Sequence, residues 1–165
     1  VLAPDVAWLI QRSWPTLRLR LEAQQAAALA IAQALQDDVR RGRLAAVTYP
    51  GLPDHPDHAL AKAQMGGGGT MLAIEVRGGL AGARAAFDRL QHIARAPSLG
   101  GVESLATLPA FTTHAALTPA QRAAAGIPDG LLRVSVGLEG AEVLLADLRQ
   151  AIHGGATQGG ATHGG

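Results

Sequence analysis

Cysteine is absent from the 165 residues of this chain, which excludes disulfide bridges, thiolate metal sites and a cysteine nucleophile. Aromatic residues make up only 3% of the sequence, so the chain has little stacking surface for a planar ligand. The hydrophobic core must therefore be built from leucine, valine, isoleucine and alanine.

Neither sign of charge dominates, because 14 lysines and arginines face 13 aspartates and glutamates and leave a net charge of +1. Without a basic run, the chain carries no electrostatic footprint for nucleic acid or for an anionic membrane. No apolar run approaches the roughly 18 to 20 residues that span a bilayer, because charged residues or glutamine interrupt every run. The composition predicts one soluble domain with neither nucleic acid nor membrane as a partner.

The start of the chain also lacks expected features. Val1 stands where an initiator methionine would be, and no basic segment typical of a signal peptide follows it. We therefore expect a fragment whose natural start lies upstream. Lysine is almost absent too, since Lys62 is the single lysine beside 13 arginines.

Helical periodicity is clearest over residues 19–41, where apolar residues recur close to every 3.6 positions until Gly42. A shorter helix is predicted over 4–14, with Pro15 breaking or kinking it. Further helices are expected over 57–65, with Asp57 as N-cap, over 80–92, over 118–126 behind a Thr118 N-cap, and over 144–152.

Strands are predicted over 45–49, 70–77 and 131–138. In the last of these, Leu132, Val134, Val136 and Leu138 share one face, and Arg133, Ser135 and Gly137 share the other. Residues 94–117 read as an irregular connection with one further short strand at most. Three or four short strands interleaved with helices predict a small α/β sandwich whose strand order the sequence leaves open.

Three segments resemble binding motifs and do not satisfy them. The loop Gly66–Gly69 precedes a strand and lacks the ending of a phosphate-binding loop, so we interpret it as a permissive turn. His55 and His58 have metal-like spacing, but prolines stiffen this stretch and no further ligand lies near, which favours a turn and a helix cap. The repeats of residues 153–165 predict a disordered Gly/Ala/Thr tail rather than a metal site. On the residues alone, the chain is a binding or accessory domain without a complete catalytic set.

Two longer motifs change this interpretation. The segments 98–104, Ser-Leu-Gly-Gly-Val-Glu-Ser, and 131–139, Leu-Leu-Arg-Val-Ser-Val-Gly-Leu-Glu, together resemble the C-terminal part of the pyridoxal-phosphate-dependent transsulfuration enzymes, the family of cystathionine γ-synthase and cystathionine γ-lyase. The resemblance covers about residues 2–152. Further matching segments occur in the family's order: Tyr49-Pro50-Gly51-Leu52-Pro53, His55-Pro56, Leu60-Ala61-Lys62, Gln64-Met65, Pro109-Ala110, Thr113-His114-Ala115, Gly126-Ile127 and Asp129-Gly130-Leu131.

The resemblance implies the small C-terminal domain of a fold-type I, aspartate aminotransferase-like enzyme, with a short and mostly antiparallel sheet covered by helices. Residues 1–42 would form a helical lead-in and linking helix, 43–152 the α/β domain, and 153–165 the tail. The N-terminal domain that binds pyridoxal phosphate and carries the Schiff-base lysine would be absent. Lys62 matches an ordinary surface lysine of the family, so no catalytic, cofactor-binding or metal-binding residue is expected in this chain.

Three substrate-binding residues follow from the resemblance. Arg133 matches the arginine that grips the substrate α-carboxylate, and a guanidinium on the polar face of a strand suits that task. Without the resemblance, Arg133 would read as an exposed strand arginine. Ser98 matches a serine lining the same pocket, and Thr113 lies in a segment near it.

The resemblance implies a cytoplasmic, homotetrameric enzyme. Its activity would act on C–S or C–O bonds at the γ-carbon of homoserine-derived or cystathionine-like amino acids. The fragment alone is expected to be inactive. Pro97 stands where many relatives have glutamate, so γ-synthase, γ-lyase and related sulfhydrylase activities stay open. Ser13-Trp14-Pro15 also departs from the family pattern. The alternative is a non-catalytic truncated product or free-standing domain that keeps only the fold.

Overall fold

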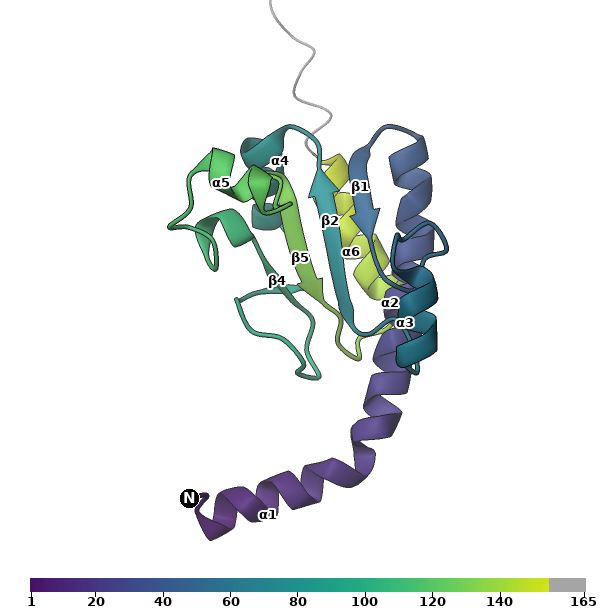
Figure 1. The fold of residues 1–165 in the computed structure, drawn as a ribbon, viewed down its shortest axis with the longest axis vertical. Helices are drawn as coiled ribbons and strands as arrows, with labels where there is room; N and C mark the ends of the chain where they lie inside the picture. The colour runs from purple at the N-terminus through teal and green to yellow at the C-terminus, as the bar shows by residue number, and fades with distance from the viewer. Residues whose placement is uncertain (155–165) are drawn as a thin grey trace, which may run out of the picture.

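The computed structural model describes residues 1–154 and contains one five-stranded sheet with the strand order β1-β2-β5-β4-β3 (Figure 1). The sheet is mixed, because β3 and β4 pair parallel while the other neighbours pair antiparallel. The expected three or four strands are exceeded because the irregular connection contributes two. The strands are β1 (Leu44–Thr48), β2 (Met71–Val76), β3 (Ala94–Arg95), β4 (Leu105–Thr107) and β5 (Leu131–Ser135).

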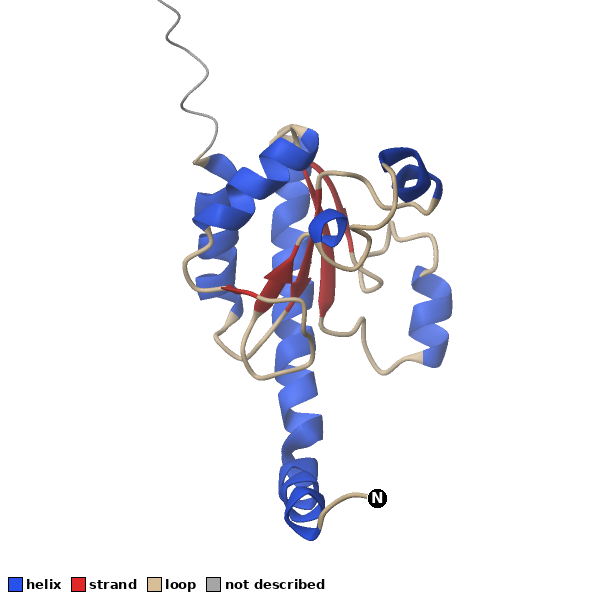
Figure 2. Ribbon diagram, turned by 90° about the vertical axis from the view of Figure 1, so that its left-hand side faces the viewer, coloured by secondary structure: helices blue, strands red, loops and turns tan. Residues whose placement is uncertain are grey.

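Helices cover one face of this sheet. Helix α2 packs on β1 and on α6, and α4 packs on α6 and on the central strands (Figures 1 and 2). The helices are α1 (Pro4–Ser13), α2 (Leu17–Arg40), α3 (His58–Gln64), α4 (Gly79–Arg89), α5 (Pro119–Ala124) and α6 (Ala141–His153), with 3-10 turns η1 (Trp14–Thr16) and η2 (Pro109–Phe111).

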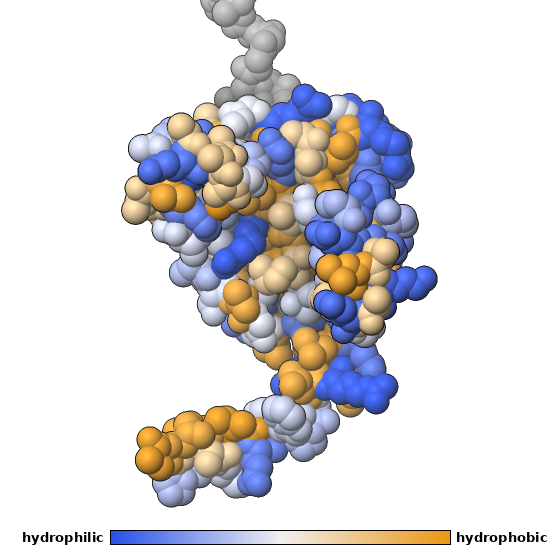
Figure 3. Space-filling model, in the orientation of Figure 1, coloured by the Kyte–Doolittle hydropathy of each residue, from blue (hydrophilic) through white to orange (hydrophobic). Residues whose placement is uncertain are grey.

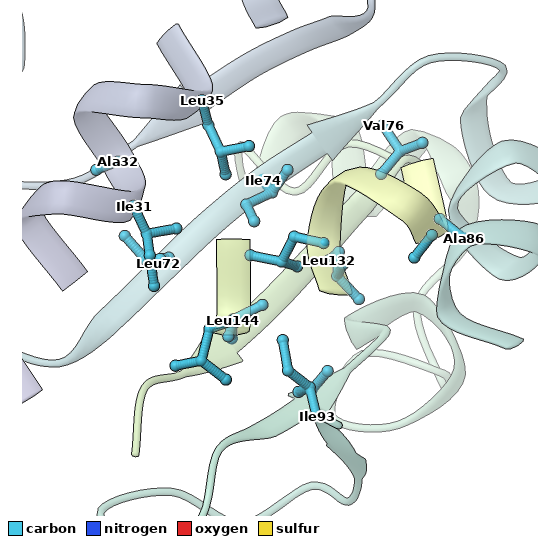
Figure 4. Packing of buried hydrophobic residues seen from close by; sticks show 14 of the residues in the cluster. Ile31, Ala32, Leu35, Leu72, Ile74, Val76, Ala86, Ile93, Leu132 and Leu144 are labelled. Atoms are coloured by element: carbon cyan, nitrogen blue, oxygen red, sulfur yellow. The ribbon is translucent and has the colours of Figure 1, made fainter. Parts of the chain in front are cut away.

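The core lies between this helical layer and the sheet. Strand β2 alternates as its sequence predicts, with Leu72, Ile74 and Val76 buried and the residues between them partly exposed. Their side chains meet Leu132 of β5 and Leu35 of α2 (Figure 4). The opposite face of the sheet carries the other residues of each strand, and in Figure 1 the strands lie in front of α2 and α6 on that side. Figure 3 shows apolar surface on this face between more polar flanks.

The residues before Gln24 form an arm that leaves the body (Figure 1). Helix α1 buries none of its residues, and the 3-10 turn at Pro15 redirects the chain into α2, as the proline predicts. Gln24 is the first buried residue of α2, so the helix meets the body only after two turns. The arm exposes large apolar side chains, among them Val6, Trp8, Leu9, Ile10, Trp14 and Leu19.

Some predicted boundaries are wrong. Helix α4 ends at Arg89 instead of residue 92, and β5 ends at Ser135 instead of 138. Beyond β5 the chain leaves the sheet, so Leu138 is 43% exposed although its alternation predicted burial. His153 still belongs to α6, one residue past the expected tail boundary. The rest of that predicted tail, residues 155–165, lies outside the described residues.

Of the two predicted N-caps, one makes its capping hydrogen bonds and the other does not. Thr118 caps α5 through a reciprocal pair with Gln121, with Pro119 at the first helical position, as predicted. Asp57 stands at the N-cap of α3, but its side chain makes no capping hydrogen bond. Among residues 1–154 no helix is both long and apolar enough for a bilayer, and that range holds no group of His, Asp or Glu suited to a metal ion.

Candidate substrate-carboxylate site

Arg133 lies at the middle of β5, near the centre of the sheet. The register places it opposite Ala73 on β2 and opposite Thr107 on β4, and paired residues share a face. Because its neighbours Leu132 and Val134 point into the core, Arg133 points to the open face. The methyl group of Ala73 leaves room for the long arginine side chain beside it.

The guanidinium of Arg133 is oriented by the loop after β3. Its Nη2 donates to the carbonyl oxygen of Pro97 at 2.7 Å and lies 3.5 Å from that of Ser98. Within residues 1–154, Arg133 forms no ion pair, and its Nε and Nη1 groups donate to no protein atom. A held guanidinium with unused donors is suited to a planar anion such as a carboxylate.

The part of Ser98 that lies close to Arg133 is its backbone carbonyl group. The residue is exposed, and the neighbouring Gly100 is held by a hydrogen bond from its amide to the Ser135 hydroxyl at 3.1 Å. Ser135 is buried and lies two residues after Arg133 on the same face of β5. Sequence reasoning placed Ser135 on that face and missed its part in holding the loop. The structure brings the Ser98 loop and Arg133 together, while the substrate contact of either residue stays a prediction.

Thr113 is not joined to this pair by any hydrogen bond in the described part of the chain. It is exposed, and its hydroxyl lies 2.8 Å from Nδ1 of His114. Thr107 is the threonine next to Arg133, and its hydroxyl lies 3.0 Å from that of Thr112. Only strand pairing brings Thr107 to this place, so the sequence carried no signal for it.

A second polar group fixes the far end of the same loop. Glu139 accepts hydrogen bonds from the Ser104 amide at 2.6 Å and from the Ser104 hydroxyl at 2.7 Å. That hydroxyl in turn accepts from the Gly137 amide at 2.7 Å. Since Gly137 follows β5 and Ser104 precedes β4, the loop is bound to the sheet at both of its ends.

Lys62 lies apart from the Arg133 site. The cofactor requires a lysine at the reacting centre, and Lys62 is the only lysine of the chain. Lys62 is exposed on α3, beyond the β1 edge of the sheet, next to a cavity of about 370 Å³ that Arg133 does not line. The expectation that no residue of this chain anchors the cofactor stays a prediction.

The structure is an α/β domain with an arginine, Arg133, on the open face of its sheet. Comparison with known proteins makes the class specific. The family described as Cys/Met metabolism PLP-dependent enzyme matches residues 1–153, and the chain belongs to this family.

Relatives and solved structures agree with that assignment. L-methionine gamma-lyase of Pseudomonas deceptionensis is 46% identical over 152 residues, which are 92% of this chain and 37% of that protein. Cystathionine gamma-lyase of Dictyostelium discoideum is 42% identical, with 92% and 38% covered. Cystathionine gamma synthase from Xanthomonas oryzae pv. oryzae, solved in complex with cystathionine, is 49% identical with a TM-score of 0.82, covering 91% of this chain and 38% of that one. The chain thus spans less than two fifths of the length of these relatives, and the predicted family is confirmed.

Proposed function

We propose that this chain is the C-terminal, substrate-carboxylate-binding part of a pyridoxal-phosphate-dependent transsulfuration enzyme. The observation that carries the proposal is the guanidinium of Arg133, unpaired within residues 1–154 and held by Pro97 at the centre of the open sheet face. Family membership supports an amino acid as the bound anion. Bound cofactor would supply the electron sink for the reaction.

The residues of this chain would bind and orient the substrate. Arg133 donates its free N–H groups to the α-carboxylate, and the Ser98 hydroxyl adds a neutral hydrogen bond beside it. Holding the carboxylate fixes the α-carbon relative to the reacting centre, which lowers the entropy lost on reaction. The cofactor and its lysine would come from an N-terminal domain outside this chain, whose contact would cover the open face.

The bond acted on is proposed to be C–S or C–O at the γ-carbon of a homoserine-derived or cystathionine-like amino acid. Relatives at similar identity carry the names cystathionine gamma-lyase, cystathionine beta-lyase and O-succinylhomoserine sulfhydrylase. Pro97 stands where many relatives have glutamate, so the proposal leaves the choice between these activities open. The proposed enzyme is a cytoplasmic homotetramer.

Arg133 is tested in a subunit of family length that carries this chain, for example fused behind the upstream part of the Xanthomonas oryzae synthase. Arg133→Ala should lower kcat/KM for every amino-acid substrate by about thirtyfold to several thousandfold, equivalent to about 2 to 5 kcal/mol. Arg133→Lys should recover part of the loss, since an ammonium keeps the charge and lacks the fork. Ser98→Ala should cost about 1 kcal/mol.

The control is Arg95→Ala, which removes a surface arginine of the edge strand β3 that contacts Asp88 of α4. It should leave kcat/KM unchanged. Substrates with different side chains should all lose affinity in Arg133→Ala, because they share the carboxylate. A loss confined to one side chain would assign Arg133 to the γ-substituent instead, and no loss would leave the fold-only alternative.

A further inference from the structure

We propose that Gln24 of the linking helix α2 is a positioning residue for the carboxylate site. It holds the loop that carries Ser98 against the end of the strand that carries Arg133. The inference rests on the proposed function for its consequence in binding, whereas the tie itself is a property of this chain.

The side chain of Gln24 is 3% exposed and lies where α2 first meets the body. Its amide nitrogen donates to the carbonyl oxygen of Gly101 at 2.8 Å and to that of Val136 at 2.9 Å. An amide NH₂ group has two hydrogens, so both are used. Gly101 belongs to the loop and Val136 directly follows β5, and one side chain therefore joins three segments far apart in the sequence.

The loop depends on such ties because residues 97–104 form no helix or strand. One tie comes from Ser135, whose hydroxyl accepts from the Gly100 amide, and another is the backbone bond from Leu138 to Val102 at 2.8 Å. Both run to β5 or the residues after it. Gln24 supplies the bond that fixes the loop to the helical layer, and it does so one residue from the Gly100 contact.

Loss of this amide would leave the buried Val136 carbonyl and the partly buried Gly101 carbonyl without their donor. Water or a shifted loop would have to satisfy them. The Pro97 carbonyl that orients Arg133 sits at the other end of this short loop, so a displaced loop misaligns the guanidinium. Small misplacements of a positioning element weaken substrate binding without touching the reacting atoms.

Gln25, the next residue of α2, provides a matched control. Its side-chain oxygen accepts from the Gly69 amide at 3.2 Å, which ties the helix to the glycine loop before β2. The two glutamines therefore hold different loops. Exchange at one loop should respond to one substitution and not to the other.

The first test measures backbone hydrogen exchange by mass spectrometry on the full 165-residue chain at low micromolar concentration. Gln24→Met keeps the length of the side chain and removes the donors. Peptides covering 97–103 should exchange at least about tenfold faster, while peptides covering 66–70 should not change. Gln25→Met should give the reverse pattern. Should Gln24→Met fail to fold, Gln24→Asn keeps an amide that cannot span both carbonyls and should give a smaller change in the same direction.

The second test uses kinetics in the subunit of family length. Gln24→Met should raise KM about tenfold for amino acids with different side chains and change kcat by less than about threefold. Unchanged exchange in 97–103 overturns the tie. Faster exchange with an unchanged KM, in an enzyme where Arg133→Ala does raise KM, overturns the positioning role. No effect of Arg133→Ala contradicts the proposed function, and the exchange result then judges the tie alone.

Discussion

Single buried polar residues do much of the joining in this molecule. Asp147 of α6 is 2% exposed and accepts hydrogen bonds from the backbone amides of Gln91, His92 and Ile93 at 2.8 to 2.9 Å. The side-chain amide of Gln150 adds a fourth. Burial alone would raise the pKa of Asp147, but these donors outweigh it and hold the pKa below its ordinary value. The hydrogen bonds to Asp147 hold the amides of residues 91–93 outside a helix, so α4 ends earlier than its sequence predicts.

Asp147→Asn should destabilise the chain by about 3 kcal/mol at pH 7, since an amide NH₂ would face backbone donors that lose a charged acceptor. Unfolding in urea measures this. A carboxyl whose folded pKa is depressed stabilises the protein above its unfolded pKa and loses that effect as pH falls through the folded pKa. The difference between wild type and variant should therefore shrink below about pH 4.

Asp57→Asn is the control for this prediction, because Asp57 is exposed and makes no capping bond. It should change stability by less than about 0.5 kcal/mol. A difference between wild type and Asp147→Asn that is as large at pH 3 as at pH 7 would show that the carboxylate charge is not what stabilises this loop.

Elements are placed by close backbone approaches as well as by side chains. The sequence predicts a turn into β5 at Asp129-Gly130. In the structure Gly130 also lies in close contact with the backbone of β2. Gly130 accepts a backbone hydrogen bond from Val76 at 2.9 Å, and a Cβ built on Gly130 would lie 2.4 Å from the Val76 carbonyl oxygen. The start of β5 therefore packs against the end of β2 with no room for a side chain.

Gly130→Ala should destabilise the chain by about 1 to 3 kcal/mol, because the obstructing atom is backbone and the strands must separate. Gly66→Ala is the matched control, since nothing lies within 4 Å of its Cβ position and its φ is not positive. That substitution should be neutral or stabilise by up to about 1 kcal/mol through the unfolded chain. Thermal unfolding of both variants decides the matter, and equal melting temperatures would contradict the close approach.

At the scale of the whole molecule, the described residues leave two surfaces bare: the open sheet face and the arm. Trp14 of η1 is 70% exposed and Leu9 of α1 is 51% exposed, and neither element buries any of its residues. Together with Val6 and Leu17 they line an apolar groove of about 310 Å³ at the bend of the arm (Figure 3). Contiguous apolar surface of this kind is typical of a contact with another domain.

The 165-residue chain should accordingly self-associate when it is studied alone. Light scattering should show an apparent mass that rises with protein concentration. Replacing Leu9 and Trp14 by serine removes apolar surface from α1 and η1, which bury none of their residues, so association should weaken while the fold persists. A monomeric mass of the unaltered chain at every concentration would show that the arm does not mediate self-association.

Much of the local structure can be read from this sequence. The apolar period of α2, the alternation of β2, the break at Pro15 and the capping box at Thr118 all follow from neighbours along the chain. The ends of α4 and β5 cannot be read from neighbours along the chain. The end of α4 is set by hydrogen bonds to Asp147, and after β5 the chain leaves the sheet, where Leu138 bonds to Val102. Both partners lie more than 30 residues away in the sequence.

For the site, the sequence determined the family and the candidates Arg133 and Ser98, because motifs and their order along the chain can be recognised without coordinates. Only the tertiary structure decided that Pro97 orients Arg133, that Thr107 and not Thr113 is its neighbour on the sheet, and that Gln24 ties the loop. Helix period and strand alternation are set by short-range sterics and burial. Hydrogen bonds between segments depend on strand order and helix placement, which emerge only when the whole chain packs.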